Sequence, residues 1–170
     1  YGEFITEPSL DLAKLLSTMV YKIIAFLFFH RTKYDTVDIS DSLIKAKESL
    51  KDNQEIVVFS SKNPFNFYDI INNLDDISHQ DVYGILTLPE EDKDSYPLVI
   101  GVAGSLGWGD HHHGYMERYL NEGIAVFSLH SFKSRGVVST VGKQVSVTIP
   151  MVCHDAYMAL DVLSERDDII

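Results

Sequence analysis

Two apolar runs that lack polar alternation constrain the fold of this chain more than any other feature. Residues 98–103 (LVIGVA) and 124–129 (IAVFSL) are of the kind expected for strands buried on both faces of a parallel sheet. Between them, Asp110 is a candidate N-cap for a helix that extends to about residue 122. A second helix follows from Pro150, a residue that suits the first helical turn. The order strand, helix, strand, helix predicts a right-handed crossover unit of an α/β domain.

The helix that begins near Pro150 is expected to bury an apolar stripe. The residues of this stripe recur at helical spacing: Val152, Ala156, Ala159, Leu160 and Leu163. Further upstream, residues 55–60 and 82–88 are candidate strands that we expect to pair antiparallel. The fold class is therefore α/β, with a mostly parallel sheet, an antiparallel N-terminal strand pair and flanking helices. We assign residues 54–170 to this domain and residues 1–53 to an N-terminal helical extension.

The segment that joins the first two candidate strands is rich in aromatic side chains for a loop. Pro64, Phe65, Phe67 and Tyr68 occur in it among several asparagines. We expect these side chains to form a small hydrophobic cluster that covers the sheet. A lid over a substrate is the alternative interpretation.

Charge balance and the N-terminal composition limit the partners of this chain. With 14 basic and 25 acidic residues its net charge is −11, which argues against nucleic acid, because phosphate binding depends on Lys and Arg. The apolar segment from Leu15 to Phe29 is too short to span a bilayer and contains Lys22. We expect a packing helix there, with a membrane-associated or targeting segment as the open alternative. We expect a soluble protein, in the cytoplasm or the periplasm.

A loop of small residues follows the first buried strand, at the strand end where open parallel sheets bind ligands. Gly104 and Gly107 enclose Ser105 and Leu106, and the next helix adds the positive end of its dipole. Main-chain N–H groups in such a loop can bind an oxyanion or a phosphate, although a tight turn without a ligand has the same pattern. A nucleotide-phosphate site is the weaker alternative, because both Gly-x-Gly-x-x-Gly and Gly-Lys-Ser/Thr are absent.

A second loop motif, Ser-Phe-Lys-Ser-Arg-Gly at residues 131–136, follows the other buried strand. Together with Ala-Gly-Ser at residues 103–105, it resembles the dienelactone hydrolase family of α/β-hydrolases, over roughly residues 82–170. In that family the corresponding motifs are typically Asp-Ser-Phe-x-x-Arg-Gly and His-Gly followed by a small residue. Here His130 stands in place of the Asp, and Ala103 stands in place of the His.

The resemblance implies a partial α/β-hydrolase fold whose site lies at the ends of these two strands. The main-chain N–H of Ser105 would donate to the oxyanion, with Leu106 as the second candidate. The candidate residues of the substrate pocket are Gly104, Trp108, His111, Ser131 and Arg135. No Gly-x-Ser-x-Gly nucleophile elbow occurs in the 170 residues, and the resemblance places the elbow after Ile170. The nucleophile, the acid and the catalytic histidine are therefore expected outside this sequence.

Several residues of metal-binding or nucleophilic type have a simpler interpretation. The three histidines 111–113 are adjacent on a helix and point about 100° apart, so they cannot readily share one ion. Cys153, His154 and Asp155 fail as a triad for the same geometric reason, and Cys153 is expected to be a small buried side chain. We expect neither a metal nor an organic cofactor. Arg135 is expected to pair with a carboxylate that fixes its loop, with substrate binding as the alternative.

The functional hypothesis is the N-terminal portion of a hydrolase for ester, lactone or similar acyl bonds in small molecules. These residues alone should have no triad-based activity. The remainder of the hydrolase, either continuous with this chain or a second fragment, is expected to cover strand 98–103, because natural proteins avoid long apolar edge strands. A function of another class is also open: a non-catalytic partner or assembly module that retains half of the hydrolase fold.

Overall fold

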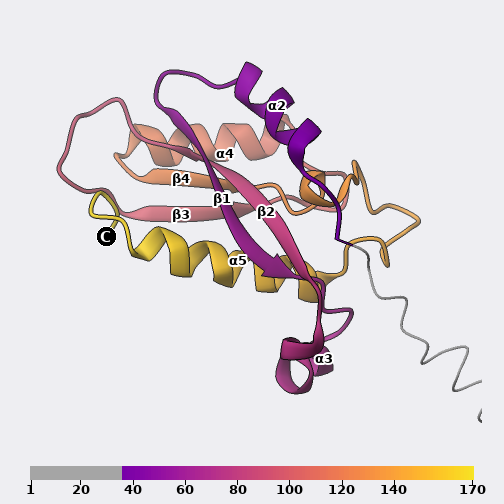
Figure 1. Ribbon diagram of the computed structural model, residues 1–170. Helices are drawn as coiled ribbons and strands as arrows, with labels where there is room; N and C mark the ends of the chain where they lie inside the picture. Colours follow the sequence, from indigo (N-terminus) through magenta and orange to yellow (C-terminus); the bar gives the residue numbers. More distant parts are fainter. Residues whose placement is uncertain (1–35) are drawn as a thin grey trace, which may run out of the picture. The chain divides into compact units, whose positions relative to one another are not determined.

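A computed structural model describes residues 36–170, which form a sheet with helices around it (Figure 1). In chain order the elements are α2 (Ser40–Glu48), β1 (Gln54–Lys62), α3 (Phe67–Asn72), the 3-10 helix η1 (Leu74–Asp76), β2 (His79–Thr87), β3 (Leu98–Val102), α4 (Asp110–Asn121), β4 (Ala125–Leu129), the 3-10 helix η2 (Lys133–Arg135) and α5 (Ile149–Ser164). The four predicted strands and the two helices of the crossover unit are all present. The predicted helix between Leu15 and Phe29 lies outside the described residues. Within residues 36–170, no helix combines the length and the apolar character that crossing a membrane requires.

The four strands form one sheet in the order β1-β2-β4-β3. β1 pairs antiparallel with β2, as predicted, and β2 also pairs antiparallel with β4. Only β3 and β4 are parallel, so the prediction of a mostly parallel sheet is wrong for the described strands. The two apolar runs do form strands, but only β4 is buried along most of its length. β3 is largely half-buried and Val102 is 43% exposed, because β3 lies at the edge of the described sheet. An apolar run also does not specify the direction of the neighbouring strand. The coarser prediction, an α/β fold with flanking helices, is confirmed.

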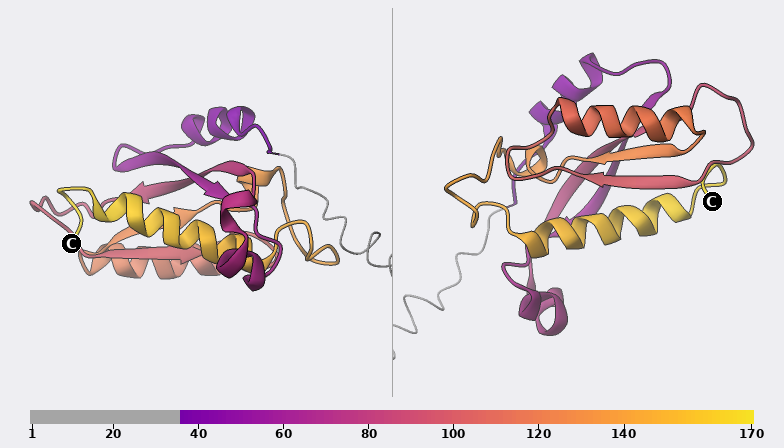
Figure 2. Two further views of the ribbon diagram at one scale, coloured as in Figure 1. Left: turned by 60° about the horizontal axis from the view of Figure 1, so that its bottom comes forward. Right: turned by 180° about the vertical axis from the view of Figure 1, so that it is seen from behind.

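Helices α4 and α5 cover opposite faces of the sheet (Figure 2). On one face, Leu98 and Ile100 of β3 pack against the core cluster, to which Leu163 of α5 belongs. Gly101 faces the other side, where an added Cβ would lie only 1.9 Å from Met116 Cε of α4. The core cluster consists of Phe59, Val82, Leu86, Tyr96, Ala125, Phe127, Leu129, Ala159 and Leu163.

Different side chains cap the two long helices. Asp110, the predicted cap of α4, is instead the first helical residue, and Gly109 precedes it as N-cap. The main-chain N–H of Gly109 donates a 3.1 Å hydrogen bond to His112 Nδ1, so a histidine provides the capping contact. In α5, Thr148 Oγ1 accepts a hydrogen bond from the N–H of Met151, and a proline occupies the first turn as predicted.

The buried face of α5 differs from the predicted stripe. Ala159 and Leu163 are buried as expected, but Leu160 is 48% exposed. His154 and Asp155 are buried in its place, and Asp155 has no exposed surface at all. The spacing of apolar residues cannot predict this buried face, because its two polar side chains are hydrogen-bonded to residues from distant parts of the chain.

The segment between β1 and β2 also differs from its prediction. It forms the short helix α3, which begins with a capping box in which the Asn66 side chain and the Asp69 side chain each accept a main-chain N–H. Phe67, Tyr68 and Ile71 of this helix are all more than half exposed. These apolar side chains therefore do not cover the sheet.

Candidate functional site

A pocket of about 390 Å³ lies at the carboxyl ends of β3 and β4. It is lined by Val102, Ala103, Leu106, Gly107, Trp108, His113, Ser128, Leu129, His130, Ser131, Phe132, Lys133, Val137, Val138 and Val152, together with Gln54 and Ile85. Three of the predicted site residues belong to this lining: Leu106, Trp108 and Ser131. Four others do not: Gly104, Ser105, His111 and Arg135. The two loops therefore meet at one pocket, although they contribute to it unequally.

The loop after β3 is a tight turn that leaves two donors free. The N–H of Gly107 donates a 2.8 Å hydrogen bond to the carbonyl of Gly104, and Gly107 has a φ of +80°, which favours glycine. The carbonyl of Ser105 accepts a 2.9 Å hydrogen bond from the N–H of Thr140. The N–H groups of Ser105 and Leu106 donate to no acceptor within residues 36–170. Both predicted oxyanion donors are therefore available to a ligand.

Trp108 forms a fixed wall of the pocket. Its indole Nε1 donates a 3.0 Å hydrogen bond to the carbonyl of Leu129, at the end of β4. Its ring stacks with that of His113 at a centroid distance of 5.9 Å, and the His130 ring lies 6.1 Å away. Gly101 beneath the indole provides the room, because a Cβ there would lie 2.9 Å from the Trp108 ring. The indole therefore packs directly against β3.

The three consecutive histidines have separate environments. His112 caps α4 through Nδ1, His113 lines the pocket, and His111 is exposed beside His112. No group of three or more His, Cys, Asp or Glu side chains among the described residues is arranged to hold a metal ion. Of the three, only His113 is placed to contact a molecule in the pocket.

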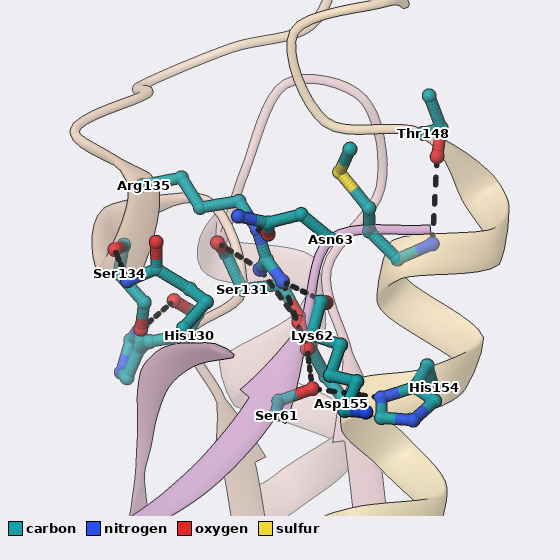
Figure 3. A network of polar contacts seen from close by, with 12 residues as sticks. Ser61, Lys62, Asn63, His130, Ser131, Ser134, Arg135, Thr148, His154 and Asp155 are labelled. Atoms are coloured by element: carbon teal, nitrogen blue, oxygen red, sulfur yellow. Dashed lines mark hydrogen bonds and ion pairs between the residues drawn. The ribbon is translucent and has the colours of Figure 1, made fainter. Parts of the chain in front are cut away.

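Arg135 lies in a buried polar network beside the pocket (Figure 3). Its Nη1 and Nη2 bind the two carboxylate oxygens of Asp155 at 2.7 and 3.0 Å. Its Nε donates to Asn63 Oδ1, and its Nη groups also donate to the carbonyls of Ser131 and Lys62. A guanidinium has five N–H donors, so this set uses all of them. Arg135 therefore pairs with a carboxylate, as predicted for a residue that fixes its loop.

Ser61 joins the same network and completes a group of Ser, His and Asp side chains. Its hydroxyl donates to Asp155 Oδ1 at 2.6 Å and lies 2.9 Å from His154 Nδ1. Burial lowers the pKa of His154, which favours its neutral form, despite the opposing effect of Asp155. Ser61 is only 1% exposed and gives its proton to the carboxylate, so this group is not arranged as a nucleophile and its base. Sequence reasoning missed Ser61, because nothing in a strand pattern marks one serine as buried and paired.

Ser134 holds the loop after β4 against the sheet. Its hydroxyl donates a 2.9 Å hydrogen bond to the carbonyl of His130 and accepts one from the N–H of Tyr83. Gln80, fully buried in β2, donates to the carbonyl of Ser134. The loop is thus fixed through Ser134 and Arg135.

Two buried polar atoms beside the pocket have no hydrogen-bond partner in the described part of the chain, namely His130 Nδ1 and Ser131 Oγ. Both residues line the pocket, and each is less than a tenth exposed. Burial, assisted by the positive charges of Lys133 and His113, lowers the pKa of His130 to about 4. The His130 ring is therefore neutral at pH 7.

Comparison with known proteins gives only distant likenesses to solved structures. No protein family model matches this chain, and no curated protein matches it. A solved structure named "m3DLH" is similar, with 15% sequence identity and a TM-score of 0.43. The similarity covers 69% of this chain and 46% of that one, so this chain spans less than half the length of that structure.

Proposed function

We propose that this chain supplies the oxyanion-binding part of a hydrolase that acts on ester, lactone or similar acyl bonds in small molecules. The observation that carries the proposal is the pair of free N–H groups, of Ser105 and Leu106, in the turn that leads into the pocket. Donors held in this way stabilise the negative charge that develops on a carbonyl oxygen under nucleophilic attack. The stabilisation is about 3 kcal/mol for each donor in comparable enzymes.

The nucleophile of this reaction comes from outside the 170 residues. They contain no nucleophile elbow, and in the group of Ser61, His154 and Asp155 the serine is buried and the carboxylate is paired with Arg135. The hydroxyl or thiol that attacks the carbonyl is therefore supplied by further residues of the protein or by a second fragment. The 170 residues alone should not hydrolyse a nitrophenyl ester with saturable kinetics.

The free edge of β3 supports such an assembly. In the sheet formed by the described residues, β3 has β4 on one side only. Next to its open side, Ile169 makes a parallel bridge with Tyr96, and the N–H of Ile170 donates a 2.9 Å hydrogen bond to the carbonyl of Tyr96. We infer that a parallel strand continues this pairing along β3. Deuterium exchange of the β3 amides tests this, because exchange of Ile100 and Val102 should slow when the covering strand is present.

A substitution that deletes one N–H tests the oxyanion role. Ser105 is the second residue of the turn from Gly104 to Gly107, a position where proline is favoured, so Ser105→Pro removes the donor and suits the turn. In the complete, active protein we expect kcat to fall about 100-fold or more. Ser105→Ala, which keeps the N–H, is the matched control and should retain most activity.

The two variants should have the same circular dichroism spectrum and the same midpoint of unfolding within a few degrees. If Ser105→Pro and Ser105→Ala are equally active, the N–H of Ser105 does not bind the oxyanion. The same comparison would then move to Leu106, whose N–H is the second free donor of the turn.

A further inference from the structure

Large hydrophobic side chains that face solvent gather where β1, β3 and β4 end. Because β1 and β4 are both antiparallel to β2, the carboxyl ends of β1, β3 and β4 lie at one edge of the sheet. Seven side chains on the segments beyond these strands are each more than half exposed, and we call them the apolar rim: Phe67, Tyr68, Ile71, Leu106, Val138, Val141 and Ile149. Side chains of similar exposure elsewhere lie on separate elements, such as Ile44 on α2 and Tyr157 on α5. Exposed apolar surface is therefore concentrated at this edge.

Hydrogen bonds hold the segments of the apolar rim next to one another. The carbonyl of Ser105, in the turn after β3, accepts a 2.9 Å hydrogen bond from the N–H of Thr140. At the other end of the same loop, Thr148 Oγ1 donates a 3.1 Å hydrogen bond to the carbonyl of Pro64, just before α3. The loop of residues 137–149 thus connects the turn after β3 with α3. Figure 2 shows this loop and α3 on the side away from the C-terminus.

The apolar rim carries little charge, although the chain has 25 acidic residues. The segments that contain it are residues 63–72, 103–109 and 137–149. They include only two charged side chains, Asp69 and Lys143. Asp69 is buried, because its carboxylate caps α3 by accepting main-chain N–H groups. The nearest exposed acids in the sequence lie beyond the segments, at Asp75, Asp76 and Asp110. The rim is therefore an apolar surface without an exposed carboxylate of its own.

The residue types and the position of the apolar rim favour a lipid bilayer as its partner. Exposed Phe, Tyr and aliphatic side chains are the types that enter the interfacial region of a bilayer. The apolar run Leu15–Phe29 ends seven residues before Thr36 in the sequence. Thr36 Oγ1 donates a 2.6 Å hydrogen bond to the carbonyl of His79, which pairs with Lys62 at the end of β1. The described chain thus begins at the edge that carries the rim, and firm attachment to a membrane usually combines two such apolar elements.

The strand that we expect beside β3 does not account for the exposed side chains of α3. β1 and β3 are the outer strands of the described sheet, and β1 is the strand that leads into α3. A strand added beside β3 therefore lies at the opposite side of the sheet from β1.

We propose that the apolar rim docks on the surface of a lipid bilayer. The bilayer is zwitterionic, because the net charge of −11 on the chain opposes an anionic surface. Leu106 and Val138 of the rim also line the pocket, so the pocket opens on the docked side. The docking requires no catalysis and is independent of the proposed hydrolase function.

Vesicle flotation tests the docking with the purified intact protein. We expect the protein to float with phosphatidylcholine vesicles and to bind less to vesicles enriched in phosphatidylglycerol. The rim variant, Ile71→Ser, Val138→Ser and Ile149→Ser combined, should bind phosphatidylcholine vesicles about tenfold more weakly or worse, because three exposed apolar side chains are lost.

A matched control variant combines Ile44→Ser, Tyr115→Ser and Tyr157→Ser, which are exposed on α2, α4 and α5. It should bind the vesicles as tightly as the original protein. Both variants change exposed side chains only, so their circular dichroism spectra should match that of the original. Equal binding by the two variants, or an intact protein that does not float, would overturn the proposal.

An introduced tryptophan shows which surface meets the lipid. Trp108 is the single tryptophan of the chain, so it gives the same background in every variant. Lipids brominated in their acyl chains should quench the fluorescence of Ile71→Trp and leave that of Tyr157→Trp unchanged. Equal quenching of both would mean that another part of the chain, such as the run Leu15–Phe29, attaches the protein, and the rim proposal would fail.

Sedimentation velocity without lipid distinguishes a second copy of the chain as the partner. We expect the original protein and the rim variant to have the same oligomeric state. If the original is a dimer and the rim variant is a monomer, the apolar rim binds another copy and the bilayer proposal is wrong.

Discussion

Arg135 and Asp155 form a two-bond ion pair inside the protein, with N–O distances of 2.7 and 3.0 Å and almost no exposed side-chain surface. The pair joins the loop after β4 to α5, and Ser61 ties the end of β1 to the same carboxylate. Three elements that approach the pocket are thus connected through one buried carboxylate. The main effect of such a pair is to fix the relative positions of these elements. Its net contribution to stability is small, because the desolvation of both charges largely offsets their Coulombic attraction.

Asp155→Asn should destabilise the protein severely. It leaves the Arg135 guanidinium buried without its counter-ion, and breaking a buried pair in this way costs about 3 to 5 kcal/mol. Urea unfolding measures the change in the free energy of unfolding. The control is Asp168→Asn, which breaks the partly exposed pair with Arg166 and should cost at most about 1 kcal/mol. If the two variants lose similar amounts of unfolding free energy, the buried Arg135–Asp155 pair matters no more to stability than the partly exposed pair.

Gly84→Ala should also destabilise the sheet. An added Cβ at Gly84 would lie 2.1 Å from Phe127 Cζ, because the ring packs directly on the glycine. Overpacking of this kind costs about 1 to 3 kcal/mol. Gly114→Ala is the control: Gly114 lies within α4 with open space around it, so alanine should stabilise the helix by up to about 1 kcal/mol. Thermal unfolding of both variants shows whether each change raises or lowers stability. A higher unfolding midpoint for Gly84→Ala would be inconsistent with the packing of Phe127 on Gly84.

Stability should fall as the pH falls from about 6.5 to about 4, in part because of His130. Its pKa is lowered in the folded protein to about 4, so between these values the unfolded chain binds the proton and the folded protein does not. The penalty is complete below the folded pKa and amounts to roughly 3 kcal/mol at most. His154, whose pKa is also lowered, acts in the same direction.

The contribution of His130 is measured by the free energy of unfolding between pH 7 and pH 4.5, in the original protein and in His130→Asn. The variant should lose clearly less stability over this interval. Parallel pH dependences of the two proteins would mean that His130 titrates normally.

The cap of α4 depends on His112. His112→Ala removes the acceptor of the Gly109 N–H and should cost about 1 kcal/mol, as for other N-terminal caps. His111→Ala changes an exposed side chain and should alter stability by less than about 0.5 kcal/mol. Chemical denaturation distinguishes the two histidines, and equal effects would argue against the capping role.

Local patterns predicted the elements of this fold well. The apolar runs that became β3 and β4, and the proline in the first turn of α5, act through near neighbours in the chain. The turn after β3 is also a local feature, because glycine at position 107 adopts a left-handed conformation without steric cost. The site could be placed at these strand ends because parallel neighbours end at the same edge of a sheet.

The amino-acid sequence by itself determined the four strands and the two helices of the crossover unit, and the edge of the sheet at which its two loops lie. Only the tertiary structure decided that β2 lies antiparallel to β4, and that α5 buries Asp155 and exposes Leu160. Both results depend on contacts between residues far apart in the chain. Asp155 is stable inside the protein because Arg135 and Ser61 satisfy it, and no pattern within one helix contains its partners. His130 and Ser131 are the converse case, because the fold buries them and provides no partner in the described residues.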